Sequence, residues 1–179
     1  MAHMYFVRHG QTTWNLQKKV FGATDAPLTE LGLAQAEETG RKIVEAGIQA
    51  DEILYSPLSR AADTAAVISR ITGIPAKPEP RLKEQCFGKW EGMPNGTEEF
   101  KKAKQSFLCR YEGGESMFQM AQRIYNLLDE IRGEAHRKTV ILVAHNGISR
   151  VIESYFRDMT NEEFASFGVK NCGIVEYTF

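Results

Sequence analysis

The sequence has few cysteines, no long apolar run and almost no net charge, and each of these features excludes a class of protein. Its three cysteines, Cys86, Cys109 and Cys172, are scattered and form no C-x-x-C pair. This argues against a disulfide framework or a structural zinc site and favours a reducing compartment. No apolar run approaches the roughly 20 residues of a membrane-spanning helix, and the N-terminus lacks the regions of a signal peptide. We therefore expect a cytoplasmic protein without a membrane partner.

The charge balance argues against a nucleic-acid partner. The chain has 22 Lys and Arg residues and 23 Asp and Glu residues, which leaves a formal net charge of -1. Any anion site must therefore be built locally, from a few cations. The length of 179 residues and the hydrophobic content of 42% fit one domain with a sizeable core. Oligomeric state stays open, since no heptad pattern is legible.

Short apolar runs alternate with helical patterns, which predicts an α/β fold. The expected strands lie at 5–7, 52–55, near 76, at 139–144 and, as an edge strand, within 172–179. The expected helices lie at 29–46, 58–72, 117–131 and 147–156, with a further start at Thr160. We read residues 1–179 as a single domain in which 93–112, with weak periodicity, form an excursion or partial lid.

Helix start and stop signals support these assignments. Thr29 is a candidate N-cap, Gly47 and Gly73 are candidate stops, and Ser116 and Gln119 have capping-box spacing. The apolar spacing in the first long helix predicts an inward face. That predicted face comprises Leu33, Ala36, Gly40, Ile43 and Val44.

Polar residues follow three of the predicted strands. Arg8 and His9 come directly after the first strand, Ser56 after the second with Arg60 one turn further, and His145 after the strand at 139–144. In an open α/β sheet, ligands bind at the carboxyl ends of the strands. Two arginines and two histidines should therefore meet at one edge, beside helix N-termini that favour anions.

The chemistry of this group suits a phosphate ester. The planar fork of arginine matches phosphate oxygens. Neighbouring cations lower the pKa of His9, so its ring keeps a lone pair at neutral pH and can attack phosphorus. The leaving group needs a proton, and Glu84, in the loop after a proline-rich stretch, is the carboxyl best placed to deliver it.

Each of these residues taken alone also has an ordinary structural interpretation. An Arg-His pair after a strand is usually a surface pair, and a histidine such as His145 is more often a structural hydrogen-bonding group. Glu79 and Glu91 flank Glu84, and most loop carboxylates are simply solvated. We interpret His136 as solvated surface. Coincidence at three separate strand ends is what favours a functional site.

The same residues stand in motifs of a known family. The motifs are "RHGQTTWN", "DAPLTELGLAQA", "SPLSRAADTA", "RLKEQCFGKWEG", "GGES" and "VILVAHNGISRVI", in this order along nearly the whole chain. They resemble the histidine phosphatase superfamily, the phosphoglycerate mutase-like proteins. The resemblance implies a three-layer α/β/α fold with a mixed, mostly parallel sheet, and an enzyme that needs no cofactor or metal.

The resemblance also implies roles for individual residues. His9 would be the nucleophile that becomes phosphohistidine, and Glu84 the proton donor. The phosphate pocket would be completed by Arg8, Arg60, His145, the Asn15 amide and the backbone N–H of Asn146. Three departures stand out: Phe21 before Gly22 where a small hydroxyl or Gln is common, "AHNG" in place of S-H-G-G, and "CFGKWEG" in place of Y-G-x-L-x-G.

We expect a phosphatase rather than a mutase. Only 20 residues, 93–112, separate "WEG" from "GGES", whereas mutases of the family typically carry a larger insertion that excludes water. The expected substrate is a small phosphorylated metabolite; sugar phosphates, phosphoglycerates and α-ribazole phosphate all fit. Side chains for specificity would come from Gln11, Phe21, Phe87, Trp90 and the 93–112 segment, whose Lys101, Lys102, Lys104 and Arg110 favour a second acidic group.

Two other classes remain as alternatives. A non-catalytic phospho-ligand binding domain would keep the arginines and dispense with His9 and Glu84, and both are present. A two-histidine metal enzyme would need carboxylate ligands near His9 and His145, and two arginines would repel its cation.

Overall fold

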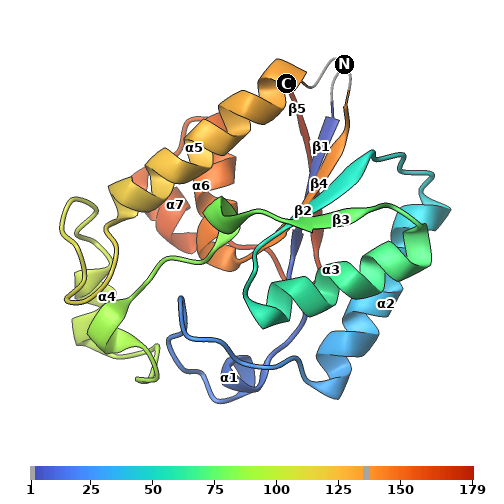
Figure 1. The fold of residues 1–179 in the computed structure, drawn as a ribbon. Coiled ribbons are helices and arrows are strands. Elements are labelled where there is room, and N and C mark those ends of the chain that lie inside the picture. Colours follow the sequence, from blue (N-terminus) through green and yellow to red (C-terminus); the bar gives the residue numbers. More distant parts are fainter. Residues whose placement is uncertain (1–2, 135–137) are drawn as a thin grey trace.

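The computed structural model describes residues 3–134 and 138–179, and a five-stranded sheet runs through its centre (Figure 1). The strands are β1 (His3–Arg8), β2 (Glu52–Tyr55), β3 (Ala76–Pro78), β4 (Val140–Ala144) and β5 (Ile174–Thr178). Their spatial order is β3-β2-β4-β1-β5. The first four are parallel to their neighbours, and β5 pairs antiparallel with β1 at the edge. The mixed, mostly parallel sheet expected from the sequence is confirmed.

Helices cover both faces of the sheet. α2 (Glu30–Glu45) and α3 (Ser59–Thr72) pack together on one face, while α5 (Met117–Glu134), α6 (Asn146–Phe156) and α7 (Asn161–Ser166) lie on the other (Figure 1). Short α1 (Thr13–Leu16) and α4 (Glu98–Ala103) and the single turns η1 (Pro80–Leu82) and η2 (Gly88–Trp90) lie in the connections. The three-layer α/β/α architecture is therefore also confirmed.

The predicted helix boundaries rest on caps that the structure contains. The Thr29 hydroxyl accepts a hydrogen bond from the backbone N–H of Gly32, which begins α2. Gly73 has a φ of 75° and ends α3. Ser116 and Gln119 each bond the other's backbone N–H at the start of α5. Short α1, whose capping box joins Thr12 and Asn15, was not among the predicted helices.

The predicted inward face of α2 is partly wrong. Leu33 and Val44 are 43% and 56% exposed. The buried residues are instead Gly32, Ala36, Thr39, Gly40 and Ile43. Small residues on this face let α2 pack closely against α3, so the helix turns Gly32, Ala36, Thr39 and Gly40 toward the interior together with Ile43.

The segment 93–112 carries α4 and lies at one edge of the molecule (Figure 1). It is anchored by Phe100, which is 4% exposed and packs against Phe87, Trp90 and Tyr111 with ring centroids 5.4–6.4 Å apart across this aromatic cluster. The excursion expected from the sequence is thus attached to the loop that carries Glu84.

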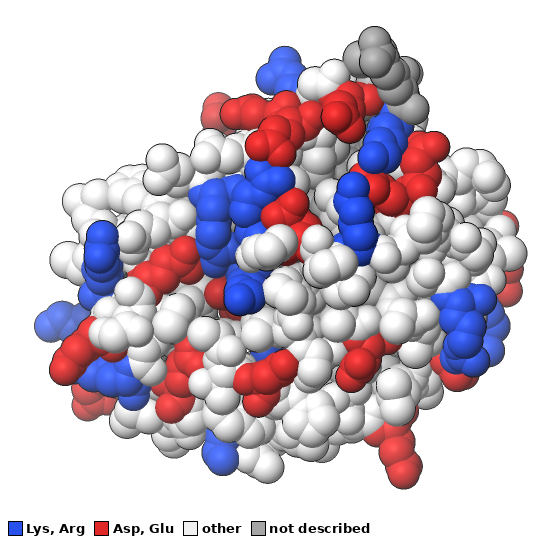
Figure 2. Space-filling view, in the orientation of Figure 1, with Lys and Arg blue, Asp and Glu red and all other residues white. Residues whose placement is uncertain are grey.

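The sequence also led to expectations about membrane spans, surface charge and His136. Within the part of the chain that the structure describes, no helix is long and apolar enough to cross a membrane. On the face shown in Figure 2, basic and acidic side chains are interspersed. His136 lies outside the described residues.

Candidate active site

The carboxyl ends of β1, β2 and β4 meet at the middle of the sheet. Arg8 is the last residue of β1 and is in register with Ala144 of β4. The backbone N–H of His9 donates to the Ala144 carbonyl at 2.9 Å, and that of Ser56 donates to Val143 at 3.0 Å. The rings of His9 and His145 consequently lie with their centroids 5.2 Å apart.

His9 is buried and its ring orientation is fixed by the backbone. Its Nδ1 lies 2.7 Å from the Gly10 carbonyl, so in the neutral ring Nδ1 carries the proton and Nε2 holds the lone pair. Burial, with the nearby charges of Arg60 and Arg8, holds the pKa of His9 well below its usual range. The ring is therefore neutral, and nucleophilic at Nε2, at neutral pH.

The backbone around His9 is held on both sides. The Asn171 side chain donates to the His9 carbonyl at 2.9 Å, and the Thr64 hydroxyl accepts from the Gly10 N–H at 3.1 Å. A Cβ at Gly10 would lie 2.4 Å from the carbonyl oxygen of Gly32. Only glycine allows the chain after the histidine to pass this close to the start of α2.

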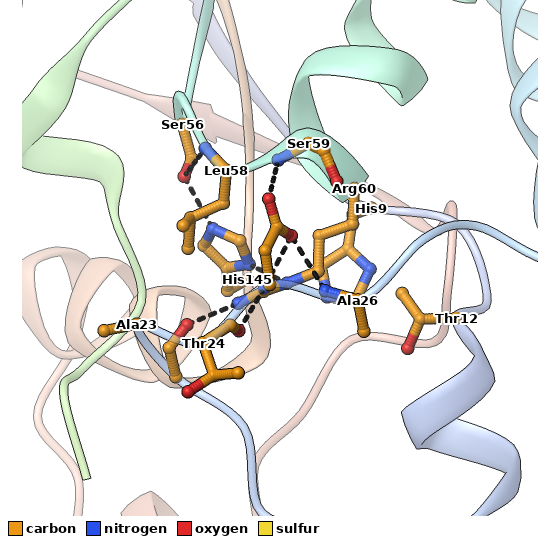
Figure 3. Close-up of polar contacts among 12 residues, drawn as sticks. His9, Thr12, Ala23, Thr24, Ala26, Ser56, Leu58, Ser59, Arg60 and His145 are labelled. Carbon is orange, nitrogen blue, oxygen red and sulfur yellow. Dashed lines mark hydrogen bonds and ion pairs between the residues drawn. The ribbon is translucent and has the colours of Figure 1, made fainter. Parts of the chain in front are cut away.

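Arg60, in the first turn of α3, is fully buried and bonds mainly to protein groups (Figure 3). Its acceptors are His145 Nδ1 at 3.2 Å, the Thr24 carbonyl at 3.0 Å, Asp25 Oδ1 at 3.2 Å and the Gly22 carbonyl at 2.7 Å. A guanidinium has five N–H donors. Four are used here, and one on Nη2 remains for an anion. The bidentate phosphate contact expected of Arg60 stays a prediction.

His145 links Arg60 to Ser56. Its Nδ1 accepts from Arg60, and its Nε2 lies 2.7 Å from the Ser56 hydroxyl (Figure 3). Burial, and then the charge of Arg60, place the pKa of His145 well below its usual range. Since both ring nitrogens have protein partners, the structure supports a positioning role for His145, and its predicted contact with phosphate stays a prediction.

Arg8 keeps donors for a ligand. Its Nη1 donates to the Val169 carbonyl at 2.7 Å, while its buried Nε has no hydrogen-bond partner among residues 3–134 and 138–179. Burial lowers the pKa of Arg8, and the charge of Glu84 opposes this effect. An unpartnered, buried guanidinium N–H is costly unless an anion binds there.

Glu84 faces the same pocket from the loop before η2. One of its oxygens accepts from its neighbour Gln85 and the other from the Gly147 N–H, both at 2.9 Å. A Cβ at Gly147 would lie 2.4 Å from Glu84 Oε1. A side chain at this glycine of "AHNG" would therefore displace the carboxylate from the start of α6.

These residues enclose a pocket of about 180 Å³, here called the phosphate pocket. Its lining includes Arg8, His9, Asn15, Phe21, Arg60, Glu84, Phe87, Lys104, Met117, Asn146 and Arg150. Of the residues predicted to bind substrate, Asn15, Phe21 and Asn146 are thus at the pocket. Phe21 lies beneath the Arg60 guanidinium, 4.7 Å from its ring centroid.

The side-chain oxygens of Asn15 and Asn146 bond to the protein, while the predicted phosphate contacts of the Asn15 amide N–H and the Asn146 backbone N–H stay predictions. Asn15 Oδ1 accepts from the Thr12 N–H at 2.9 Å, and Asn146 Oδ1 accepts from the Val169 N–H at 3.0 Å. Neither Gln11 nor Gly22 belongs to the lining of the phosphate pocket. The Gln11 side-chain oxygen accepts from Thr29 at 3.1 Å, and the Gly22 carbonyl accepts from Arg60.

Arg150 was not among the residues predicted for the site. It stands four residues after Asn146 on α6, so the spacing of one helical turn could have indicated that it faces the same pocket as Asn146. Thr64 and Asn171, which hold the backbone of His9, gave no sequence signal because their partners are distant in the chain. No group of three or more His, Cys, Asp or Glu side chains within the described ranges is arranged to hold a metal ion.

Comparison with known proteins identifies relatives of this chain. The chain matches the family model "Histidine phosphatase superfamily (branch 1)" over residues 4–179. The probable phosphoglycerate mutase GpmB of Yersinia pestis is 32% identical over an alignment of 152 residues, and the match covers 81% of this chain and 70% of that protein.

Solved structures agree over more of the chain. A mycobacterial glucosyl-3-phosphoglycerate phosphatase in complex with VO3 is 26% identical with a TM-score of 0.85, and the match covers 98% of this chain and 92% of that chain. A putative alpha-ribazole-5'-P phosphatase from Escherichia coli is 23% identical with a TM-score of 0.84, over 98% of this chain and 89% of that one, and shares the fold.

Proposed function

This chain belongs to the histidine phosphatase superfamily, and we propose that within it the chain is a metal-independent phosphatase that hydrolyses a small phosphomonoester through a phosphohistidine intermediate. The observation that carries the proposal is the His9 ring: neutral, held through Nδ1 by the Gly10 carbonyl, and lining a pocket with Arg8 and Arg60. The phosphatase among the solved relatives with 26% identity supports the same reaction class.

In the first step, His9 Nε2 attacks phosphorus, and the bond to the ester oxygen breaks. Glu84, in its acid form, gives its proton to the departing oxygen. The imidazole becomes cationic as the P–N bond forms, and the Gly10 carbonyl at Nδ1 stabilises that charge. The cations of Arg8 and Arg60 oppose the negative charge on the phosphoryl oxygens.

In the second step, water replaces the histidine. The Glu84 carboxylate takes a proton from the water, the water oxygen attacks phosphorus, and the P–N bond breaks. Inorganic phosphate leaves, Glu84 is again an acid, and His9 returns to its neutral form with the lone pair on Nε2. The two steps consume one water and restore every protein group.

Phosphoglycerate mutase-type transfer is the second candidate, because the curated relative at 32% identity is a probable mutase. Both reactions share the phosphohistidine and differ in the acceptor, water or a substrate hydroxyl. A mutase must exclude water while its intermediate persists. The short 93–112 segment, whose only helix within the described residues is the six-residue α4, offers little cover and favours hydrolysis.

A panel of phosphorylated metabolites, scored for free phosphate and for isomerised product, tests this choice. We expect free phosphate from at least one small monoester and no isomer of 3-phosphoglycerate. Isomerisation faster than phosphate release would establish the mutase instead. We also propose a cytoplasmic location, which the three free cysteines support.

A further inference from the structure

A groove adjoins the phosphate pocket and has no role in the reaction described above. Its volume is about 520 Å³. Lys104, Met117 and Arg150 line both the groove and the phosphate pocket. A leaving group attached to a phosphoryl group in the pocket can therefore extend past these three side chains into the groove.

Two cations, Lys104 and Arg150, lie at the junction of the groove and the phosphate pocket. Arg150 Nε donates to the Phe167 carbonyl at 2.7 Å. Within the described residues, neither Arg150 nor Lys104 forms an ion pair, whereas the exposed Lys101 on α4 pairs with Glu98 at 2.6 Å. Burial lowers the pKa of both junction cations, and the charge of Arg150 lowers that of Lys104 further. Placing two half-buried cations together is unfavourable unless an anion lies between them.

Glu84 is the acidic group whose charge acts on both cations, raising their pKa. Its two oxygens, however, accept from Gln85 and Gly147. Among residues 3–134 and 138–179, no hydrogen bond or ion pair joins Glu84 to Lys104 or Arg150, so the free donors of these two cations remain for a ligand.

Beyond the junction, the groove is mainly apolar. Its walls include Phe107, Met117, Phe164 and Ala165, with Glu162 among its polar residues. The rings of Phe107 and Phe164 meet edge to face with centroids 5.6 Å apart. Walls of this kind fit a ring or an alkyl chain.

We propose that Lys104 and Arg150 bind a second anionic group, a carboxylate or phosphate, on the leaving group of the substrate, and that an apolar part of that leaving group occupies the groove. This inference rests on the proposed phosphatase function. It assigns the substrate class as phosphomonoesters that carry a further acid and an apolar substituent.

Two matched esters test the anion site: N-benzoyl-O-phosphoserine and its neutral C-terminal amide. We expect the wild type to prefer the acid by about tenfold in kcat/KM, as a charge-assisted contact requires. In Lys104→Gln and in Arg150→Gln this acid-to-amide ratio should fall toward one. Because the ratio is taken within each variant, a general loss of activity cancels.

Lys102→Gln is the matched control, since it removes the same charge two residues away, at an exposed position that lines neither cavity. Its ratio should equal that of the wild type. A wild-type ratio near one would overturn the inference, and so would equal losses on both esters in Lys104→Gln and Arg150→Gln. Equal losses would assign the two cations to the transferred phosphoryl group.

The groove is tested with N-acetyl-O-phosphoserine beside the N-benzoyl ester. Ala165→Trp fills the groove from an exposed position on α7 and should lower kcat/KM for the benzoyl ester more than for the acetyl ester. Equal effects would overturn the apolar part of the inference. Hydrolysis of p-nitrophenyl phosphate that depends on His9, combined with negative results here, would leave the proposed function intact and refute this inference alone.

Discussion

Arg60 offers the sharpest structural perturbation, because one buried side chain bonds four protein groups. In Arg60→Met, water can replace the arginine at Thr24 and Asp25, which are exposed. The Gly22 carbonyl and His145 Nδ1 are buried and lose their donor. At about 1–3 kcal/mol for each unsatisfied buried group, the free energy of unfolding should fall by about 2–6 kcal/mol. At about 2–4 °C for each kcal/mol in a domain of this size, Tm should fall by about 4–24 °C.

The same variant should change the pH dependence of catalysis. The charge of Arg60 helps to lower the pKa of His9, so removing it should move the acid limb of the kcat/KM profile to higher pH. Arg60→Lys keeps the charge but not the four hydrogen bonds. It should therefore lose stability while its acid limb stays close to that of the wild type.

Thermal unfolding and pH profiles of p-nitrophenyl phosphate hydrolysis, measured on both variants, check this reasoning. Using one substrate throughout means that substrate ionisation is common to all profiles. An Arg60→Met protein with the wild-type Tm, or with an unmoved acid limb, would refute the role assigned to Arg60.

Three further predictions follow from the site. Glu84→Gln should lower kcat/KM for an alkyl phosphate by about 10²–10⁴-fold and far less for p-nitrophenyl phosphate, whose leaving group needs no proton; equal losses on both substrates would count against a proton donor. The native pKa values of His9 and His145 lie well below 6.5, so their contribution to stability is complete above that pH and should decline as the pH falls below it, by up to about 1.4 kcal/mol per pH unit for each histidine. The free energy of unfolding, measured with urea at pH values from about 7 to about 5, should show this decline. A free energy of unfolding that does not change with pH would contradict the burial of neutral histidine rings. Activity should survive EDTA, and a loss that added divalent metal restores would favour the two-histidine metal alternative.

The sheet was predictable from local sequence signals. Buried strands such as Val140–Ala144 are continuous apolar runs, and the polar site residues follow directly after the strands in the sequence. Once the strands are taken as parallel neighbours, His9 and His145 must lie at the same edge. Caps at Thr29 and Gly73 set helix ends for equally local reasons.

What the sequence did not reveal depends on contacts between distant segments. The inward face of α2 depends on close packing against α3. The spacing of apolar residues within α2 carries no information on that packing, so the prediction that Leu33 and Val44 face inward is wrong. The acceptors of Arg60 include the backbone carbonyl of Gly22, 38 residues away. A sequence motif does not indicate which backbone carbonyl a side chain will contact. Arg150 joins Lys104 only because α6 and the end of α4 meet at one groove.

The phosphohistidine is tested most directly by trapping it. The protein is mixed with radiolabelled p-nitrophenyl phosphate, denatured rapidly in alkali, where phosphohistidine persists, and its peptides are mapped, with His9→Asn as control. We predict that the label stays bound to the denatured wild-type chain, that it maps to His9, and that His9→Asn retains none. Release of all label on denaturation, or label on another residue, would contradict the account.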